Sequence, residues 1–177
     1  MTELFKEYIK NPNRTGNIVK SSLRLRKFLA KNARKKKIVV ELGGGPGNVT
    51  SEIIKNLDKK AKLIVFELNK EFYNNLKAKI KDNRVKIVND SAINVSKHIK
   101  NVDCIISTLP LLSLQKKEVD KIIENSHKVL RKNGIFVQIQ YFYPASYKHL
   151  KSIYSKVKVK LVVLNFPFPT FVYLCRK

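Results

Sequence analysis

The stretch at residues 38–50, IVVELGGGPGNVT, constrains the fold of this 177-residue chain more than any other. A β-branched run ends in an acid and a glycine cluster, and apolar residues at helical spacing follow from Asn48. This order predicts a strand, a tight turn and a helix start. Glycine at positions 43, 45 and 47 would let the backbone approach a bound ligand where a Cβ would clash. The alternative is a purely structural turn.

Two neighbours of these glycines narrow the choice of ligand. Dinucleotide-binding enzymes carry a similar loop, so the glycines alone are weakly specific. Pro46 removes a backbone donor that a pyrophosphate cradle would use. Glu41, just before the glycines, could hold a cationic or amine-bearing ligand. The loop therefore favours a ligand with an amine over a dinucleotide.

Strand-like and helix-like patterns alternate along most of the chain. We expect strands near 63–67, 85–88, 102–107 and 134–142, and helices near 22–33, 70–81, 93–99 and 118–130. This alternation predicts an α/β fold with a mostly parallel sheet covered on both faces. The last two strand-like runs, 157–164 and 171–174, have no helix between them and should pair antiparallel. The predicted organisation is N-terminal helices at 1–34, followed by a ligand-binding domain at 35–177.

Charge is the dominant feature of the composition. The chain has 37 Lys and Arg against 13 Asp and Glu, a formal net charge of +24. Such a surface attracts polyanions, either nucleic acid or an anionic membrane. Lysines are spread along the whole chain, so charge alone does not choose between these partners.

Other composition features limit the class of protein. No run approaches the roughly 20 apolar residues that a membrane span needs. The N-terminus lacks an apolar secretory core, so we expect a cytoplasmic protein. Cys104 and Cys175 lie in apolar strand-like runs, which predicts buried free thiols. No Cys/His spacing suits a metal, so no metal site is expected.

The residues that end the predicted strands carry the expected chemistry. In an open α/β sheet the ligand lies outside the carboxyl ends of the strands. Glu41 ends the first strand, and Glu67 ends the second, where a carboxylate can accept both hydroxyls of a ribose. Asp90 follows the third and could hydrogen-bond an adenine amino group, unless it is only a helix cap. Ser107 ends the fourth, next to the expected reaction centre.

The spacing E-x-G-x-G-x-G from Glu41 is similar to the first motif of S-adenosylmethionine-dependent methyltransferases. Across nearly its full length, the chain resembles the small bacterial phospholipid N-methyltransferases, which are related to the ribosomal RNA adenine dimethyltransferases. The matching pieces are NPxxTGxIxxSS from Asn11, VELG from Val40, Glu67, Asp90-x-Ala92, SxLPL from Ser107, and NFP from Asn165 with Val172.

The resemblance implies a single Rossmann-like class I methyltransferase domain, with a seven-stranded sheet ending in an antiparallel hairpin. It implies S-adenosyl-L-methionine as cofactor and phosphatidylethanolamine, with its methylated products, as acceptor. The cofactor residues would be Ser21, Ser22, Glu41, Gly43, Gly45, Gly47, Glu67, Leu68, Asp90, Ser91, Ala92 and Ser107. Thr108, Leu109 and Pro110 would contact the substrate, and Ser107, Tyr141 and Tyr143 would serve the transfer.

Two alternatives stay open. An RNA adenine N6-methyltransferase should show an aromatic residue after strand four to stack on a flipped base. Here Leu111 stands in its place, and Ser107-Thr108 replaces the usual Asn. We also expect no second helical domain of the kind that the RNA dimethylases carry. The other alternative is a non-catalytic RNA- or membrane-binding protein with a methyltransferase fold.

The first ten residues predict an amphipathic helix. Leu4, Phe5, Tyr8 and Ile9 share one face, with basic residues nearby. The helix could lie in the interface of an anionic membrane, or it could simply pack on the domain. The first possibility predicts a cytoplasmic protein peripherally associated with the membrane.

Overall fold

The computed structural model describes residues 22–140, 146–164 and 169–177. The predictions for Leu4, Phe5, Tyr8, Ile9, Ser21, Tyr141 and Tyr143 therefore lie outside the described residues. The elements are α2 (Leu23–Ala30), η1 (Lys31–Ala33), β1 (Ile38–Leu42), α3 (Asn48–Ile54), β2 (Lys62–Phe66), α4 (Lys70–Lys79), β3 (Val85–Val88), η2 (Ala92–Asn94), α5 (Val95–His98), β4 (Val102–Ser107), η3 (Leu111–Ser113), α6 (Lys116–Val129), β5 (Leu130–Gln140), α7 (Tyr147–Ile153), β6 (Lys156–Leu164) and β7 (Pro169–Arg176).

The strands form one seven-stranded sheet in the order β3-β2-β1-β4-β5-β7-β6. The first five strands run parallel, and β7 pairs antiparallel with both β5 and β6. β4, in the middle, is buried at every position, which fits its apolar residues at 102 and 104–106. The predicted parallel sheet with an antiparallel end is confirmed.

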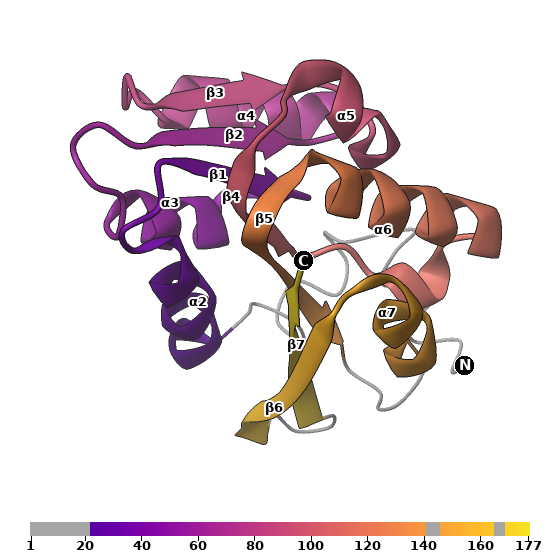
Figure 1. Cartoon of the computed structure of the whole chain (residues 1–177). Helices are drawn as coiled ribbons and strands as arrows, with labels where there is room; N and C mark the ends of the chain where they lie inside the picture. The colour runs from indigo at the N-terminus through magenta and orange to yellow at the C-terminus, as the bar shows by residue number, and fades with distance from the viewer. Residues whose placement is uncertain (1–21, 141–145, 165–168) are drawn as a thin grey trace.

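Helices cover both faces of the sheet (Figure 1). Leu25 of α2, Ile53 of α3 and Leu76 of α4 join the core on one face. Ile123 of α6 and Leu150 of α7 join the core on the other, where α5 also packs. Each helix thus buries one apolar stripe against a sheet that is apolar on both sides.

Two elements differ from the sequence-based expectation. β5 begins at Leu130, directly after α6, although we expected it only from 134. α7 was not predicted, because its seven residues bury only Leu150 and are too short for a helical period to stand out. Topology gave no reason to expect α7 either. Two parallel strands need a crossover connection, usually a helix, whereas strands that pair antiparallel do not.

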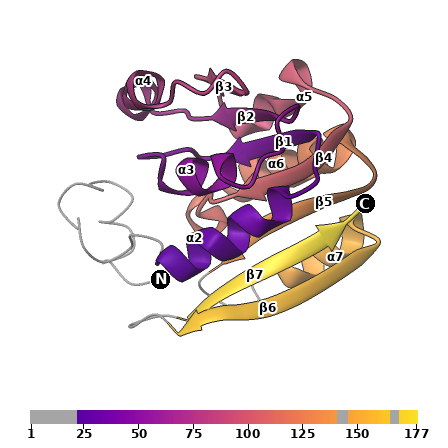
Figure 2. The same cartoon turned by 90° about the vertical axis from the view of Figure 1, so that its left-hand side faces the viewer.

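The carboxyl ends of β1, β2 and β4 lie at one edge of the sheet, here called the carboxyl edge. The turn end of the β6–β7 hairpin extends this edge, because Leu161 of β6 and Phe171 of β7 align with Gln140 at the end of β5. α2 starts there and runs toward the opposite, amino edge, where the chain enters β1 (Figure 2).

Several expectations from composition can be checked directly. Cys104 and Cys175 are free and buried, as predicted, and burial raises the pKa of each thiol to about 12. Within the described part of the chain, no helix is both long and apolar enough to cross a membrane. In the same residues, no cluster of His, Cys, Asp and Glu could hold a metal ion.

Candidate active site

The glycine loop after β1 is held against the end of β2. The amide nitrogens of Gly43 and Gly44 both donate to the Phe66 carbonyl, at 2.9 and 3.1 Å. Gly43, Gly45 and Gly47 all have left-handed backbones, with φ of 84°, 49° and 82°. Residues other than glycine are strained in this conformation, which explains why the loop has glycine at these three positions.

The three glycines differ in the space around them. A Cβ at Gly43 would lie 3.0 Å from the Leu109 side chain, and one at Gly47 would lie 2.8 Å from Leu76. Those two glycines make room for the protein's own packing. A Cβ at Gly45 would meet no atom within 4 Å. Of the three, Gly45 is therefore the position where a ligand has space to approach the backbone.

Glu67 links the end of β2 to this loop. Its side chain accepts from the Gly45 amide at 2.7 Å through one oxygen and from the Asn69 amide at 2.8 Å through the other. The residue is only 8% exposed. Each oxygen retains a further lone pair, so the predicted contact with ribose hydroxyls is compatible with this arrangement.

Glu41 is the least satisfied acid of the site. It is fully buried, and both of its carboxylate oxygens lack a hydrogen-bond partner among the described residues. The Thr50 hydroxyl of α3 is likewise buried and unpartnered. Burial raises the pKa of Glu41 from 4.5 to about 8; the neighbouring Thr50 hydroxyl lowers the pKa although its geometry falls short of a hydrogen bond, and the Glu67 carboxylate raises the pKa further. A buried acid of this kind is prepared to pair with a cation.

Asp90 is already well partnered within the protein. It accepts from the Ser91 amide at 2.7 Å, from the Asn94 side chain at 2.8 Å, and contacts His98 Nε2 at 2.7 Å. The hydrogen bonds from Asn94 and His98 hold the pKa of Asp90 near 2. Ser91 caps the turn that follows by accepting from the Ile93 amide. The cap is therefore Ser91 and not Asp90, and the contact of Asp90 with adenine stays a prediction.

The loop after β4 packs directly on the glycine loop. Thr108 donates through its hydroxyl to the Gly43 carbonyl at 2.6 Å, and its amide donates to the Leu42 carbonyl at 3.0 Å. The buried Ser107 hydroxyl lies 3.5 Å from the Leu109 amide. β1 and β4 are the two strands where the sheet order reverses, which is where open α/β sheets bind ligands.

Gln138 on β5 supports the same loop and was not found from the sequence. Its side-chain nitrogen donates to the Leu109 carbonyl at 2.9 Å, and the residue is fully buried. Asn89 was not predicted as a site residue either. Its side-chain amide donates to the carbonyls of Glu67 and Leu68. Neither belongs to a motif, and only the alignment of neighbouring strands places them at the site.

The remaining predicted site residues lie in different settings. Ser22 caps α2, with its hydroxyl accepting from the Leu25 amide at 3.3 Å. Leu68 is 70% exposed just beyond β2. Ala92 is buried and Pro110 is partly exposed next to Leu109. These positions surround the carboxyl edge from three sides.

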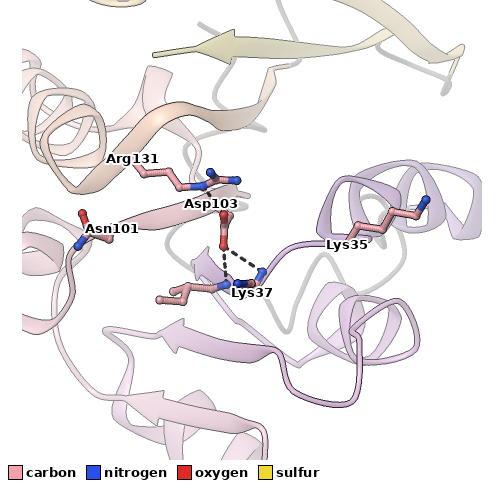
Figure 3. Close-up of a pocket in the computed structure, with 6 residues that line it drawn as sticks. Lys35, Lys37, Asn101, Asp103 and Arg131 are labelled. Atoms are coloured by element: carbon pink, nitrogen blue, oxygen red, sulfur yellow. Dashed lines mark hydrogen bonds and ion pairs between the residues drawn. The ribbon is translucent and has the colours of Figure 1, made fainter.

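A separate cavity of about 330 Å³ lies at the amino edge. Figure 3 shows Asp103 there between Arg131 and the backbone entering β1. One Asp103 oxygen accepts from the Lys37 and Ile38 amides at 2.9 and 2.8 Å, and the other pairs with Arg131. The nearby Lys35 side chain points away from Asp103. This cavity is at the wrong end of the strands for an α/β ligand site.

The family model described as Methyltransferase domain matches residues 39–134, more than half of the chain. The chain belongs to the methyltransferase-domain family. It is an enzyme that uses S-adenosyl-L-methionine, as the family does. No curated protein matches this methyltransferase.

Solved structures share the fold at low sequence identity. A putative rRNA methylase from Clostridium thermocellum has a TM-score of 0.70 at 19% identity, covering 89% of this chain and 97% of that one. A 1,6-didemethyltoxoflavin-N1-methyltransferase from Burkholderia thailandensis, with bound 1,6-didemethyltoxoflavin and S-adenosylhomocysteine, has a TM-score of 0.74 at 13% identity, covering 99% and 85%. M. jannaschii TYW2, in complex with AdoMet, has a TM-score of 0.69 at 19% identity, covering 91% and 78%.

The residues at the carboxyl edge fit S-adenosyl-L-methionine. The orphaned, buried Glu41 carboxylate suits the ammonium of the methionyl part, and the free space at Gly45 allows a close approach to the loop. When bound, the cofactor supplies a methyl group made electrophilic by its sulfonium. The fit rests on polar atoms that the protein itself leaves unpaired.

Proposed function

We propose that this methyltransferase transfers a methyl group to the amine of phosphatidylethanolamine, and to its methylated products, at an anionic membrane surface. Three observations support the proposal: the methyltransferase family, the resemblance carried by the SxLPL segment, and the strongly basic surface. Its alternative within enzymes is adenine N6-methylation of RNA.

The observation that carries the proposal is the position of Leu111. Its side chain is 2% exposed and packs in the core with residues of β4 and α6. An enzyme that methylates a flipped adenine needs an aromatic face to stack on the base. Leu111 offers neither the ring nor the exposure, so this loop favours an acceptor amine that needs no stacking.

The chain's own residues would have three tasks in the reaction. Glu41 would neutralise the cofactor's ammonium, and Glu67 would accept from its ribose hydroxyls. Thr108 and Gln138 would hold the acceptor loop against the glycine loop through their hydrogen bonds to Gly43 and Leu109. An in-line displacement depends mainly on such positioning, so no strong dedicated base is required. A water near Ser107 would carry the amine proton to solvent, with Tyr141 and Tyr143 as the sequence-based candidates beside it.

The test is a side-by-side assay of methyl transfer from radiolabelled S-adenosylmethionine into bacterial lipid extract and into ribosomal RNA. We expect label in the lipid fraction, moving with mono- and dimethylated phosphatidylethanolamine in chromatography. Vesicles with and without phosphatidylethanolamine, at equal negative charge, provide the control. Label in RNA alone would replace this function with the RNA alternative.

A further inference from the structure

The exposed side chains of α2 and of the η1 segment that follows it form a row of cations. Arg24, Lys27, Lys31 and Arg34 are all exposed and recur at spacings of three or four residues. Leu25 and Leu29, on the opposite side of the helix, are fully buried. The row therefore faces away from the sheet and is open to a partner.

A second row comes from β6. Lys158 and Lys160 are exposed, while Val157 and Val159, which alternate with them, pack against the core on the other face of the sheet. The Lys160 ammonium lies 5.9 Å from the centre of the Phe28 ring of α2. A shallow groove of about 410 Å³, lined by Phe28, Lys31, Asn32, Arg34, Lys160 and Leu174, joins the two rows. We call the two rows and this groove the α2–β6 face.

Acids are segregated away from this face. Residues 8–40 and 125–177, which contain both rows, include no Asp or Glu. Glu52 of α3 is an acid whose pKa is affected by the cations of α2. The hydrogen bond to Lys55 lowers the pKa of Glu52 most, and Lys27 and Arg26 lower it by smaller amounts. Glu52 is thus already paired with Lys55, at 2.7 Å. The positive potential of the face is left for an external anion.

An exposed leucine marks the end of the face that lies nearest the site. Leu23, at the start of α2, is 49% exposed. It lies at the carboxyl edge, because α2 begins there (Figure 2). Leu161 of β6 is also exposed, but it points to the other side of the sheet from Lys160, with Val157 and Val159. Apolar side chains beside a basic surface are typical of elements that enter the headgroup region of a membrane.

We propose that the α2–β6 face docks on an anionic bilayer, with Leu23 entering the interface beside the active site. This rests on the proposed lipid substrate, whose headgroup must reach the carboxyl edge while its chains stay in the membrane. Single-stranded RNA is disfavoured, because RNA-binding surfaces stack bases on exposed aromatic rings. Phe28, the aromatic residue in the described groove, is half-buried with Lys160 over it.

The test measures co-sedimentation of the full chain with vesicles that contain phosphatidylglycerol and phosphatidylcholine but no phosphatidylethanolamine. The K158Q/K160Q variant should bind about 30-fold more weakly at low salt, since each of the two lysines contributes about 1 kcal/mol on an anionic leaflet. The K59Q/K60Q variant removes the same charge from exposed lysines before β2, at the amino edge, and should bind like the unchanged protein. L23T should weaken binding several-fold at both low and high salt, because its effect is apolar.

The outcomes separate this surface from the proposed function. Equal losses for K158Q/K160Q and K59Q/K60Q would overturn the proposal, because net charge alone would then hold the membrane. It would also fall if K158Q/K160Q lost binding to a short RNA but kept binding to the vesicles. A selective loss on vesicles together with no methylation of phosphatidylethanolamine would support the docking face while rejecting the lipid substrate.

Discussion

The two edges of the sheet each bury a carboxylate, and they treat it in opposite ways. At the amino edge, Asp103 accepts from two backbone amides and pairs with Arg131. At the carboxyl edge, Glu41 is completely buried, and neither of its oxygens has a hydrogen-bond partner among the described residues. Both acids lie on central strands, so burial alone does not distinguish them.

The difference separates a structural acid from one that awaits a ligand. Asp103 lies at the register shift between β4 and β5 and accepts from the first amide of β1, so its carboxylate is used within the fold. Glu41 leaves the cost of desolvation uncompensated, which a stable fold tolerates when a bound ligand repays it. A buried carboxyl group without a partner at the sheet switch point is therefore a better sign of a site than the presence of a cavity.

The largest effect should come from Glu41→Gln. Burial raises the pKa of Glu41 to about 8, so the folded protein binds this proton more tightly than the unfolded chain. Its contribution to stability is therefore present at low pH and is lost as pH rises from 4.5 through about 8. Relative to the variant, the cofactor-free protein should lose on the order of 4 kcal/mol over this range. Chemical denaturation at several pH values measures it, and identical pH slopes would contradict the assigned burial.

Asp103→Asn should have the next largest effect. It should lower the stability of the fold and leave the affinity for the cofactor almost unchanged. Removing the charge weakens two backbone hydrogen bonds and the pairing with Arg131, at a cost of about 2–3 kcal/mol of stability. Affinity for S-adenosylmethionine should stay within about twofold at a temperature where the variant is folded, since the two edges are independent. Chemical denaturation measures the stability, and calorimetric titration measures the affinity. A large loss of affinity would contradict the independence of the two edges.

Glu67 provides an intermediate case, since it is buried at the carboxyl edge yet partnered by two backbone amides. Glu67→Ala should weaken S-adenosylmethionine binding by roughly 1.5–3 kcal/mol, because it leaves the ribose hydroxyls unpaired. Glu67→Gln keeps an acceptor for the Gly45 amide and serves as the matched control. Unchanged affinity in calorimetry for the Ala variant would place the ribose elsewhere.

The smallest effect is expected for Arg131→Gln. The Arg131 side chain is 52% exposed, so solvent screens its pairing with Asp103. The variant should lose less than about 1 kcal/mol of stability, and the loss should shrink in high salt. A loss as large as that of Asp103→Asn would mean that the ion pair, and not the backbone amides, satisfies this carboxylate.

Much of the fold was predictable because its signals are local. The strand, glycine loop and helix at 38–50 were recognisable from residue type and order, and β3 and β4 have the predicted bounds. The antiparallel end followed from the missing crossover. α7 escaped prediction because seven residues with one buried side chain give no periodic signal.

The site was predictable only in part. Strand-end position indicated Glu41, Glu67, Asp90 and Ser107 as candidates, and all four lie at the carboxyl edge. Their partners could not be deduced, because Gln138 reaches the Leu109 carbonyl from a different strand, 29 residues away in sequence. Contacts of that separation depend on strand order and register, which residue patterns do not encode one by one.

The sequence by itself determined the family, the element order and the types of residue at the strand ends, since these depend on local propensity and spacing. Only the tertiary structure decided that Glu41 has no partner among the described residues, that a Cβ would have free space at Gly45 but would clash with Val65 and Leu76 at Gly44, and that two distant acid-free segments form one basic face. The physical reason is that desolvation, steric contact and summed potential depend on the surroundings of a residue in space, and packing alone brings those surroundings together.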